Sequence, residues 1–417
     1  MSPSAGSASS APLLGYCTNV HAGRTLTETV SNVMRHATAV RERVAPRGFL
    51  PIGLWLSAAS AHSLHSTPDA ARRLRDSLLE RGLAVYTLNG FPYGDFHAAT
   101  VKHAVYTPHW ADVRRGLYTM QLADLLVDLL PEPGTVPGIG REASISTLPL
   151  GWRLTFSLEG CGAAVGMAAA QLEQVTRHLM RIEERTGICL HVDLEPEPGC
   201  MLDRASHVVD FFTQALRPDR TSADILRHVR VCHDVCHSAV MFEPQAEAIA
   251  TYRAAGIRIG KVQVSSAVAC DGSERAFRAL RHFDEPRWLH QTSVLDGRGE
   301  AHFYDDLERA FDHAPDGVWR VHFHVPVFAE FLGPLQTTQG EIAMALEALG
   351  TDLTATPLEV ETYAWNALPT EHRLSTLADG IAEELAWTSA LVRRLSSLRA
   401  WSHDQPDVAG RPRSPDT

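Results

Sequence analysis

The chain has no cluster of basic residues and no long apolar run. Its 38 lysines and arginines are outnumbered by 49 aspartates and glutamates, so the formal net charge is −11. Nucleic-acid binding needs a positive surface that neutralises phosphates, so we expect no nucleic-acid partner. No apolar stretch approaches the ~20 residues needed to cross a bilayer, and the N-terminus lacks the features of a secretory signal. We therefore expect a cytoplasmic protein that does not span a membrane.

Disulfides and common catalytic motifs are also missing. The seven cysteines are odd in number and scattered, which fits a reducing compartment better than a disulfide framework. The glycine cluster 134–140 matches neither nucleotide-binding fingerprint, and no Gly-x-Ser-x-Gly nucleophile elbow occurs. Cys232 and Cys236 flank His233 and His237, which leaves a thiolate zinc site conceivable, but no second cysteine pair follows.

Strand-like and helix-like segments alternate along most of the chain. This alternation predicts a parallel α/β protein, a (β/α)8 TIM barrel, with a doubly wound open sheet as the competing architecture. Apolar runs typical of strands occur near 13–20, 51–58, 83–89, 142–148, 188–195, 229–235, 260–266, 320–327 and 358–363.

Nine candidate strands exceed by one the number that such a barrel needs. We expect a single domain over 13–395 with an insertion at about 285–320, between the last two barrel strands. Whether 320–327 is a barrel strand or part of that insertion stays open at this point. Residues 1–12 and 396–417 are expected to form flexible tails.

Several of the expected strands end in a side chain that can bind a metal. Glu195 follows one apolar run, and Asp234 and His237 follow the next. Strand ends converge on one face of a barrel, where carboxylates and imidazoles would suit a divalent cation. His237 would reach a second ligand position or a substrate hydroxyl. The alternatives are an arginine partner for Glu195, and a capping Asp234 beside a surface histidine.

Later strands carry further candidate ligands. Gln263 lies on an apolar strand, where its amide needs a partner, and a metal, a bound sugar or the backbone could serve. His322 and His324 share one face of their strand because side chains alternate. Glu361 closes the last strand, while Glu359 on the same face suits a structural ion pair.

Polar and aromatic residues follow the third strand and the surplus strand region. Asn89, Tyr93 and His97 would form a lip that holds a small organic ligand, and His290 is a further candidate for substrate binding. Asn19, after the first strand, would sit at a similar position on the rim.

The order of these residues resembles that of the xylose isomerase-like TIM-barrel superfamily, which includes sugar isomerases, epimerases and endonuclease IV. A more specific resemblance, covering about residues 13–395, is to the EboE-type metabolite traffic proteins of the ebo gene cluster. It is carried by the segments Leu14–His21, Thr87–Gly94, Ser144–Pro149, Leu194–Gly199, His322–Phe328 and Glu359–Trp365.

The resemblance implies a divalent-metal site and a small-molecule metabolite as ligand. The metal positions matched are Glu195, Asp234, Gln263 and Glu361, and His237 matches the substrate-contacting histidine. Many members carry histidine where this chain has Gln263, so His290, His322 and His324 are the candidates to supply an imidazole instead.

On this reading the protein is a metal-dependent isomerase- or epimerase-like enzyme. Glu195, Glu361 and His237 would be catalytic, and mixed oxygen and nitrogen ligands favour Zn²⁺ or Mn²⁺ over Mg²⁺. Other proteins of the ebo cluster are expected as possible partners. One alternative is a non-catalytic metabolite-binding or trafficking barrel. Another, an endonuclease IV-like phosphodiesterase, is disfavoured by the acidic charge balance.

Overall fold

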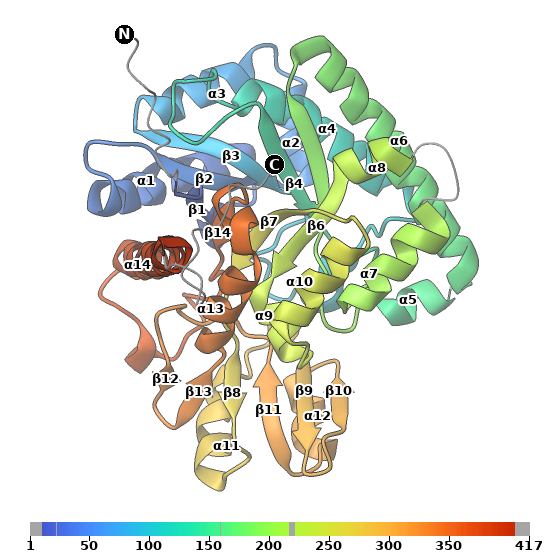
Figure 1. Cartoon of the computed structure of the whole chain (residues 1–417), viewed down its shortest axis with the longest axis vertical. Helices are drawn as coiled ribbons and strands as arrows, with labels where there is room; N and C mark the ends of the chain where they lie inside the picture. Colours follow the sequence, from blue (N-terminus) through green and yellow to red (C-terminus); the bar gives the residue numbers. More distant parts are fainter. Residues whose placement is uncertain (1–10, 22, 159, 217–221, 405–417) are drawn as a thin grey trace.

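Eight parallel strands close into a barrel in the computed structural model of the chain (Figure 1), which describes residues 11–21, 23–158, 160–216 and 222–404. The closed order is β1-β14-β7-β6-β5-β4-β3-β2. The strands are β1 (Leu14–Cys17), β2 (Leu50–Trp55), β3 (Leu83–Asn89), β4 (Glu142–Thr147), β5 (Cys189–Leu194), β6 (Val229–Asp234), β7 (Ile259–Val264) and β14 (Leu358–Val360). The expected (β/α)8 barrel is thus confirmed.

Helices surround the barrel on the outside (Figure 1). The long C-terminal helix α14 packs against α1, next to the point where β14 and β1 close the barrel. The outer helices are α1 (Leu26–Val44), α2 (Ala58–His65), α3 (Ala70–Leu79), α4 (Val113–Leu129), α5 (Arg153–Leu158), α6 (Cys161–Thr186), α7 (Ala205–Phe211), α8 (Ser222–His228), α9 (Val235–Val240), α10 (Gln245–Ala254), α13 (Gln339–Ala348) and α14 (Leu377–Asp404).

The sequence of each element explains its place in the barrel. All seven residues of β3 and all six of β5 are buried, as expected for parallel strands covered by helices on one side and by the barrel interior on the other. Helix α6 ends at Gly187, whose φ of 69° is left-handed and costs a residue without a Cβ little. The chain then enters β5 directly.

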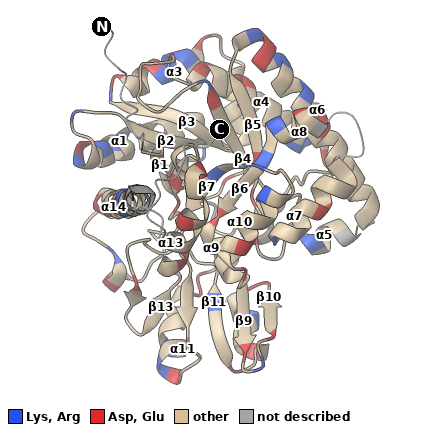
Figure 2. Ribbon diagram, in the orientation of Figure 1, with Lys and Arg blue, Asp and Glu red and all other residues tan. Residues whose placement is uncertain are grey.

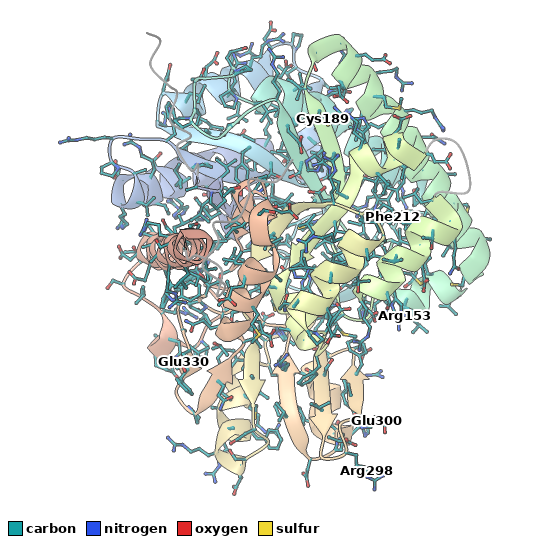
Figure 3. All side chains as sticks on the ribbon, in the orientation of Figure 1. Arg153, Cys189, Phe212, Arg298, Glu300 and Glu330 are labelled. Carbon is teal, nitrogen blue, oxygen red and sulfur yellow. The ribbon has the colours of Figure 1, made fainter. Side chains whose placement is uncertain are left out.

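A second sheet is inserted between β7 and β14, with the strand order β10-β9-β11-β8-β13-β12. It extends away from the barrel, and Arg298 and Glu300 lie at its far end (Figures 1 and 3). Its elements are β8 (Val268–Cys270), α11 (Glu274–Leu280), β9 (Thr292–Asp296), β10 (Ala301–Tyr304), α12 (Leu307–His313), β11 (Gly317–Val321), β12 (Phe331–Leu332) and β13 (Leu335–Thr337).

This sheet resolves the surplus strand and corrects the expected bounds of the insertion. The run 320–327 does not contribute a barrel strand: its first residues end β11, which pairs with β8 and β9, and the rest has no regular structure. The sheet begins at Val268 and ends at Thr337, so it reaches well beyond 285–320 on both sides. Strands of three residues, such as β8, are too short to show a hydrophobic period.

At the C-terminus, α14 continues to Asp404, so residues 396–404 are helical rather than a tail. Residues 1–10 and 405–417, which hold most of the two expected tails, lie outside the described residues. Among the described helices, none combines the length and the apolar character that a membrane-spanning segment requires. Acidic and basic residues are interspersed along the outer helices (Figure 2).

Candidate active site and metal centre

The barrel interior contains a layer of buried charges beneath the mouth. Lys261 of β7 pairs with Glu359 of β14 and donates to Ser146 Oγ at 3.2 Å. His191 Nδ1 and Asp193 Oδ1 of β5 are 2.6 Å apart, which confirms that alternate residues of this strand share one face. Glu359 therefore forms the structural ion pair that its position in the sequence suggested.

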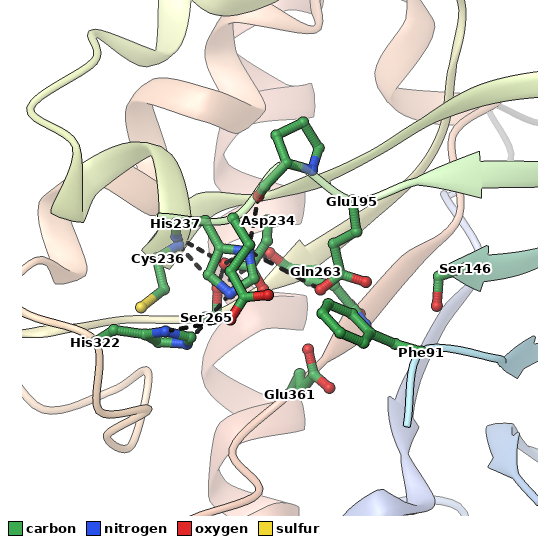
Figure 4. A network of polar contacts seen from close by, with 12 residues as sticks. Phe91, Ser146, Glu195, Asp234, Cys236, His237, Gln263, Ser265, His322 and Glu361 are labelled. Carbon is green, nitrogen blue, oxygen red and sulfur yellow. Dashed lines mark hydrogen bonds and ion pairs between the residues drawn. The ribbon is translucent and has the colours of Figure 1, made fainter. Parts of the chain in front are cut away.

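Four candidate ligands lie above this layer, where the barrel strands end. Glu195 follows β5, Asp234 ends β6, Gln263 lies on β7, and Glu361 follows β14 (Figure 4). All four are buried. Within the described residues, Glu195 Oε2, Asp234 Oδ2 and both amide atoms of Gln263 are buried without a hydrogen-bond partner. Such atoms normally find a partner when buried, so this cluster is suited to an additional ligand.

Asp234 uses only one of its two oxygens within the protein. Oδ1 accepts hydrogen bonds from the backbone nitrogen of His237 at 2.9 Å and from Ser265 Oγ at 2.7 Å, so Asp234 caps α9. Burial acts to raise the pKa of Asp234, but nearby His237 and His324 and these hydrogen bonds outweigh it and lower the pKa. The capping role and a ligand role are thus compatible, because Oδ2 stays available.

The pKa values of the two glutamates shift in the opposite direction from that of Asp234. Burial, with the nearby charges of Glu361 and Asp234, raises the pKa of Glu195 well above its usual value. Burial, followed by the charges of Asp234 and Glu359, raises the pKa of Glu361 to about 8. Asn19 Nδ2 and Asn89 Nδ2 donate to Glu361 Oε1 at 2.6 and 3.4 Å. Burial and mutual repulsion thus disfavour negative charge on both glutamates, and a bound cation would offset this cost.

Three histidines adjoin the carboxylates. His237 belongs to α9, while His322 and His324 directly follow β11 of the inserted sheet. His322 Nε2 lies 3.2 Å from Nε2 of His237 and 3.2 Å from Nε2 of His324. Burial lowers the pKa of His237 to about 4 and also lowers the pKa of His322 and His324. The inserted sheet thus brings two imidazoles to the barrel mouth.

A pocket opens onto this cluster. Of the residues expected at the site, Asn89, Glu195, His237, His322, His324 and Glu361 line it. Asp234 is not among the lining residues, but its carboxylate lies within 4.8 Å of ligand atoms of His237 and His324. Gln263 lies beside Asp234 and Glu359 in the barrel register. These residues form one continuous candidate site.

Three residues expected to bind substrate do not line the pocket. Tyr93 packs edge-on against Tyr118, with ring centroids 5.1 Å apart. His97 Nε2 is 2.7 Å from the Asn19 carbonyl. His290 Nδ1 is 3.2 Å from the His322 carbonyl. Their ring or polar contacts are with protein groups, so they support the wall behind the lining residues.

Other lining residues were not singled out from the sequence. Glu197 accepts from Tyr106 Oη at 2.7 Å and from Gln291 Nε2 at 3.0 Å, and burial raises its pKa to about 8. Glu197 stands two residues after Glu195 in Glu-Pro-Glu-Pro, which is the one signal the sequence offers for it. Tyr106 and Gln291 come from a long loop and the insertion, where no periodicity marks them. Asn19 was placed at the rim, and it does line the pocket.

The donor set fits a divalent cation. Several buried groups of histidine, cysteine and carboxylate side chains place their ligand atoms within 4.8 Å of one another, including Asp234, His237 and His324. The partnerless oxygens of Glu195, Asp234 and Gln263 would gain a partner in such an ion. The fold and the site thus define a β/α-barrel protein with a candidate metal centre at the barrel mouth.

Comparison with solved structures returns proteins of low sequence identity. The probable 3-DHS dehydratase AsbF of petrobactin synthesis from Bacillus anthracis is 12% identical, with 91% of this chain and 98% of that chain covered and a TM-score of 0.46. A xylose isomerase-like TIM barrel protein from Mycobacterium smegmatis in complex with magnesium is 12% identical, with 93% and 97% covered and a TM-score of 0.44. A D-allulose 3-epimerase from Methylomonas in complex with D-allulose is 12% identical, with 94% and 97% covered and a TM-score of 0.41.

No family model and no curated protein matches the chain. The barrel itself therefore rests on the strand pairing of this chain, and the site rests on its own geometry.

Proposed function

We propose that this chain is a metal-dependent β/α-barrel enzyme of the EboE type that isomerises or epimerises a small polyhydroxylated or carbonyl-bearing metabolite. The observation that carries the proposal is the set of buried, partnerless donor atoms at the barrel mouth. Glu195, Asp234, Gln263 and Glu361 would hold the cation. The EboE assignment is supported by the sequence segments that resemble that family, and it implies other ebo-cluster proteins as partners.

The ligand types favour Zn²⁺ or Mn²⁺ over Mg²⁺. Carboxylates alone would suit Mg²⁺, but imidazoles lie directly beside them, and nitrogen donors suit transition metals better. When bound, such a cation would polarise adjacent oxygens of a hydroxy-carbonyl compound.

Proton transfer is the chemistry that the chain's own residues support. A carboxylate of Glu195 or Glu361 would accept the proton from the carbon next to the carbonyl, and the electrons of the broken C–H bond would move towards the carbonyl oxygen. Return of the proton to the former carbonyl carbon, together with transfer of the hydroxyl proton from one oxygen to the other, completes an isomerisation. Return of the proton to the opposite face of the same carbon completes an epimerisation. The pKa of both glutamates is raised by burial, and a carboxylate with a raised pKa is a stronger base.

The lining of the pocket combines apolar and polar side chains, as small-molecule sites do. Phe91, Phe96, Trp288 and Tyr363 form an aromatic part of its lining. His237 Nε2 faces this space, since Nδ1 is 2.9 Å from the Pro196 carbonyl and therefore carries the proton. It could accept a hydrogen bond from a substrate hydroxyl.

The test combines metal analysis with exchange of substrate protons. Elemental analysis of the purified protein is expected to find a divalent transition metal, with less in Glu195→Ala and Asp234→Ala. Incubation in D₂O with a panel of aldoses and ketoses is then expected to place deuterium next to the carbonyl carbon, as read by NMR. Glu361→Gln should slow this exchange at least about 100-fold. The exposed Glu330→Gln, in the connection before β12, is the matched control and should exchange at the wild-type rate.

The outcomes separate the two main hypotheses. A wild-type protein that binds no metal would contradict the proposal at its core. A protein that binds metal and retains a small molecule, but exchanges no proton, would instead be a binding or trafficking barrel.

A further inference from the structure

The histidine cluster has a feature that the carboxylate site does not require. Each of its rings directs Nδ1 to an oxygen of the protein: His237 to the Pro196 carbonyl at 2.9 Å, His324 to the Glu361 carbonyl at 2.7 Å, and His322 to Gln291 Oε1 at 2.8 Å. A carbonyl oxygen can only accept, so Nδ1 of His237 and of His324 must carry a hydrogen.

Nδ1 of His322 also carries a hydrogen, because the side-chain amide of Gln291 has only one possible orientation. Gln291 Nε2 donates to Tyr106 Oη at 2.7 Å, to Glu197 Oε1 at 3.0 Å and to the Pro198 carbonyl at 3.4 Å. Three acceptors on that side fix the nitrogen there, so Oε1 faces His322 and Nδ1 of His322 is the donor. In their neutral forms, all three rings then have an unprotonated Nε2.

Three unprotonated Nε2 atoms therefore meet in a buried space. The separations of 3.2 Å from His322 to His237 and from His322 to His324 would bring lone pairs together with no hydrogen between them. A single added proton could bridge only one pair at a time. A cation would satisfy all three, and nitrogen ligands about 2.05 Å from a tetrahedral ion lie about 3.3 Å apart.

We propose that His237, His322 and His324 form a second cation position, distinct from the carboxylate position and selective for Zn²⁺ and similar transition metals. Three neutral imidazoles suit Zn²⁺, Co²⁺, Ni²⁺ or Cu²⁺ and are poor ligands for Mg²⁺. Nδ1 hydrogen bonds to carbonyl and carboxamide oxygens are also the usual support of metal-binding histidines. The inserted sheet supplies two of the three ligands, so the position exists only because of the insertion.

Asp234 lies between the two positions. Its carboxylate is within 4.8 Å of ligand atoms of His237 and His324, and Oδ2 has no partner among the described residues. It is thus the strongest candidate for a fourth ligand. The second cation position rests on the proposed function only in that both cations would share one pocket. His237 would then bind a cation rather than a substrate hydroxyl.

The experiment counts metals and identifies their ligands without measuring activity. Metal-free full-length protein is titrated with Zn²⁺ and analysed for bound metal, and a parallel sample receives Cu²⁺ for EPR, in which nitrogen ligands produce resolved hyperfine splitting. We expect two equivalents of Zn²⁺ and a Cu²⁺ signal with several nitrogens. His322→Asn and His324→Asn should each lose one equivalent and weaken the nitrogen splitting. The exposed His65→Asn in α2 should change neither.

A double variant, Glu195→Gln with Glu361→Gln, separates this proposal from the proposed function. If it loses one equivalent but keeps the nitrogen splitting, both positions exist. If the wild type binds one equivalent that only the histidine variants lose, the histidine position stands and the carboxylate position fails. Two results would overturn the second position. In both, the wild type binds one equivalent of Zn²⁺; the histidine variants then either retain it, or lose it together with the glutamine double variant. So does a wild-type Cu²⁺ spectrum without nitrogen splitting, a readout that needs no variant to fold.

Discussion

At the scale of single residues, the buried ion pair of Lys261 and Glu359 limits which substitutions the barrel interior can accept. Both side chains are completely buried, and Lys261 also donates to Ser146. An ion pair in the interior is costly to break, because the charge left behind has no solvent to stabilise it. A small residue next to the pair therefore cannot be replaced by a larger one without displacing one of the two charged groups.

Gly53 on β2 is such a residue. A Cβ at this position would lie 1.4 Å from Glu359 Oε1, so Gly53→Ala must displace the carboxylate from Lys261. We expect the variant to lose about 3 kcal/mol of unfolding free energy, measured by urea denaturation. Gly140→Ala is the control, because a Cβ there would meet nothing within 4 Å. Equal stability of the two variants would show that the ion pair does not depend on this space.

The residues of the site were predictable to the extent that they end barrel strands. Glu195, Asp234 and Glu361 follow recognisable apolar runs, and their convergence follows from the barrel alone. Glu197 and Gln291 were not predictable, because their places depend on how a turn and an insertion fold over the mouth. His290 is the opposite case, a residue that the sequence suggested and the structure does not place in the pocket lining. Its Nδ1 points towards the backbone carbonyl of His322.

At the scale of elements, two segments that border the pocket are hydrogen-bonded to each other. The loop between β3 and α4 contributes Phe96 and Val101, and the insertion contributes Arg287 and Trp288. The Val101 nitrogen donates to the Arg287 carbonyl at 2.7 Å, and Trp288 Nε1 donates to the Phe96 carbonyl at 3.2 Å. The inserted sheet thus shapes the pocket as well as supplying histidines.

Asp306 joins these two segments, and its loss should loosen both. Its carboxylate pairs with Lys102, accepts from the His290 nitrogen at 3.1 Å, and caps α12. We expect Asp306→Ala to cost about 1 kcal/mol of stability and to speed amide hydrogen exchange in 96–106 and 285–292. The neighbouring Asp305→Ala is the control, since Asp305 forms its ion pair with Arg309 of α12, at 3.5 Å. Indistinguishable exchange in the two variants would contradict this role of Asp306.

The barrel strands were predictable as elements, and the inserted strands mostly were not. A buried parallel strand such as β3 has seven buried residues, of which only Thr87 and Asn89 are polar. In contrast, β12 and β13 have two and three residues, and the sheet they join is assembled from segments distant in sequence. The run 320–327 resembled a strand throughout, but His322 and the residues after it leave the sheet to reach the barrel mouth.

At the scale of the whole molecule, buried ionisable groups couple stability to pH. Burial raises the pKa of Glu197 and Glu361 to about 8 and that of Glu384 to about 7. Between their unfolded values near 4.5 and these values, the folded protein binds more protons than the unfolded chain, so stability falls as pH rises. Buried His237 acts in the opposite sense, but only between about 4, its folded pKa, and 6.5, its unfolded value.

The two effects oppose each other below pH 6.5, and only the carboxyl effect remains above it. We therefore expect the melting temperature of the metal-free protein to fall by several degrees between pH 6.5 and 8, measured by calorimetry in the presence of a chelator. Glu197→Gln should reduce this decline, because an amide has no proton to lose and its oxygen can still accept from Tyr106 and Gln291. Glu330→Gln, which is exposed, should leave it unchanged. A melting temperature that rises over this interval would mean that the buried carboxyls are ionised in the metal-free fold.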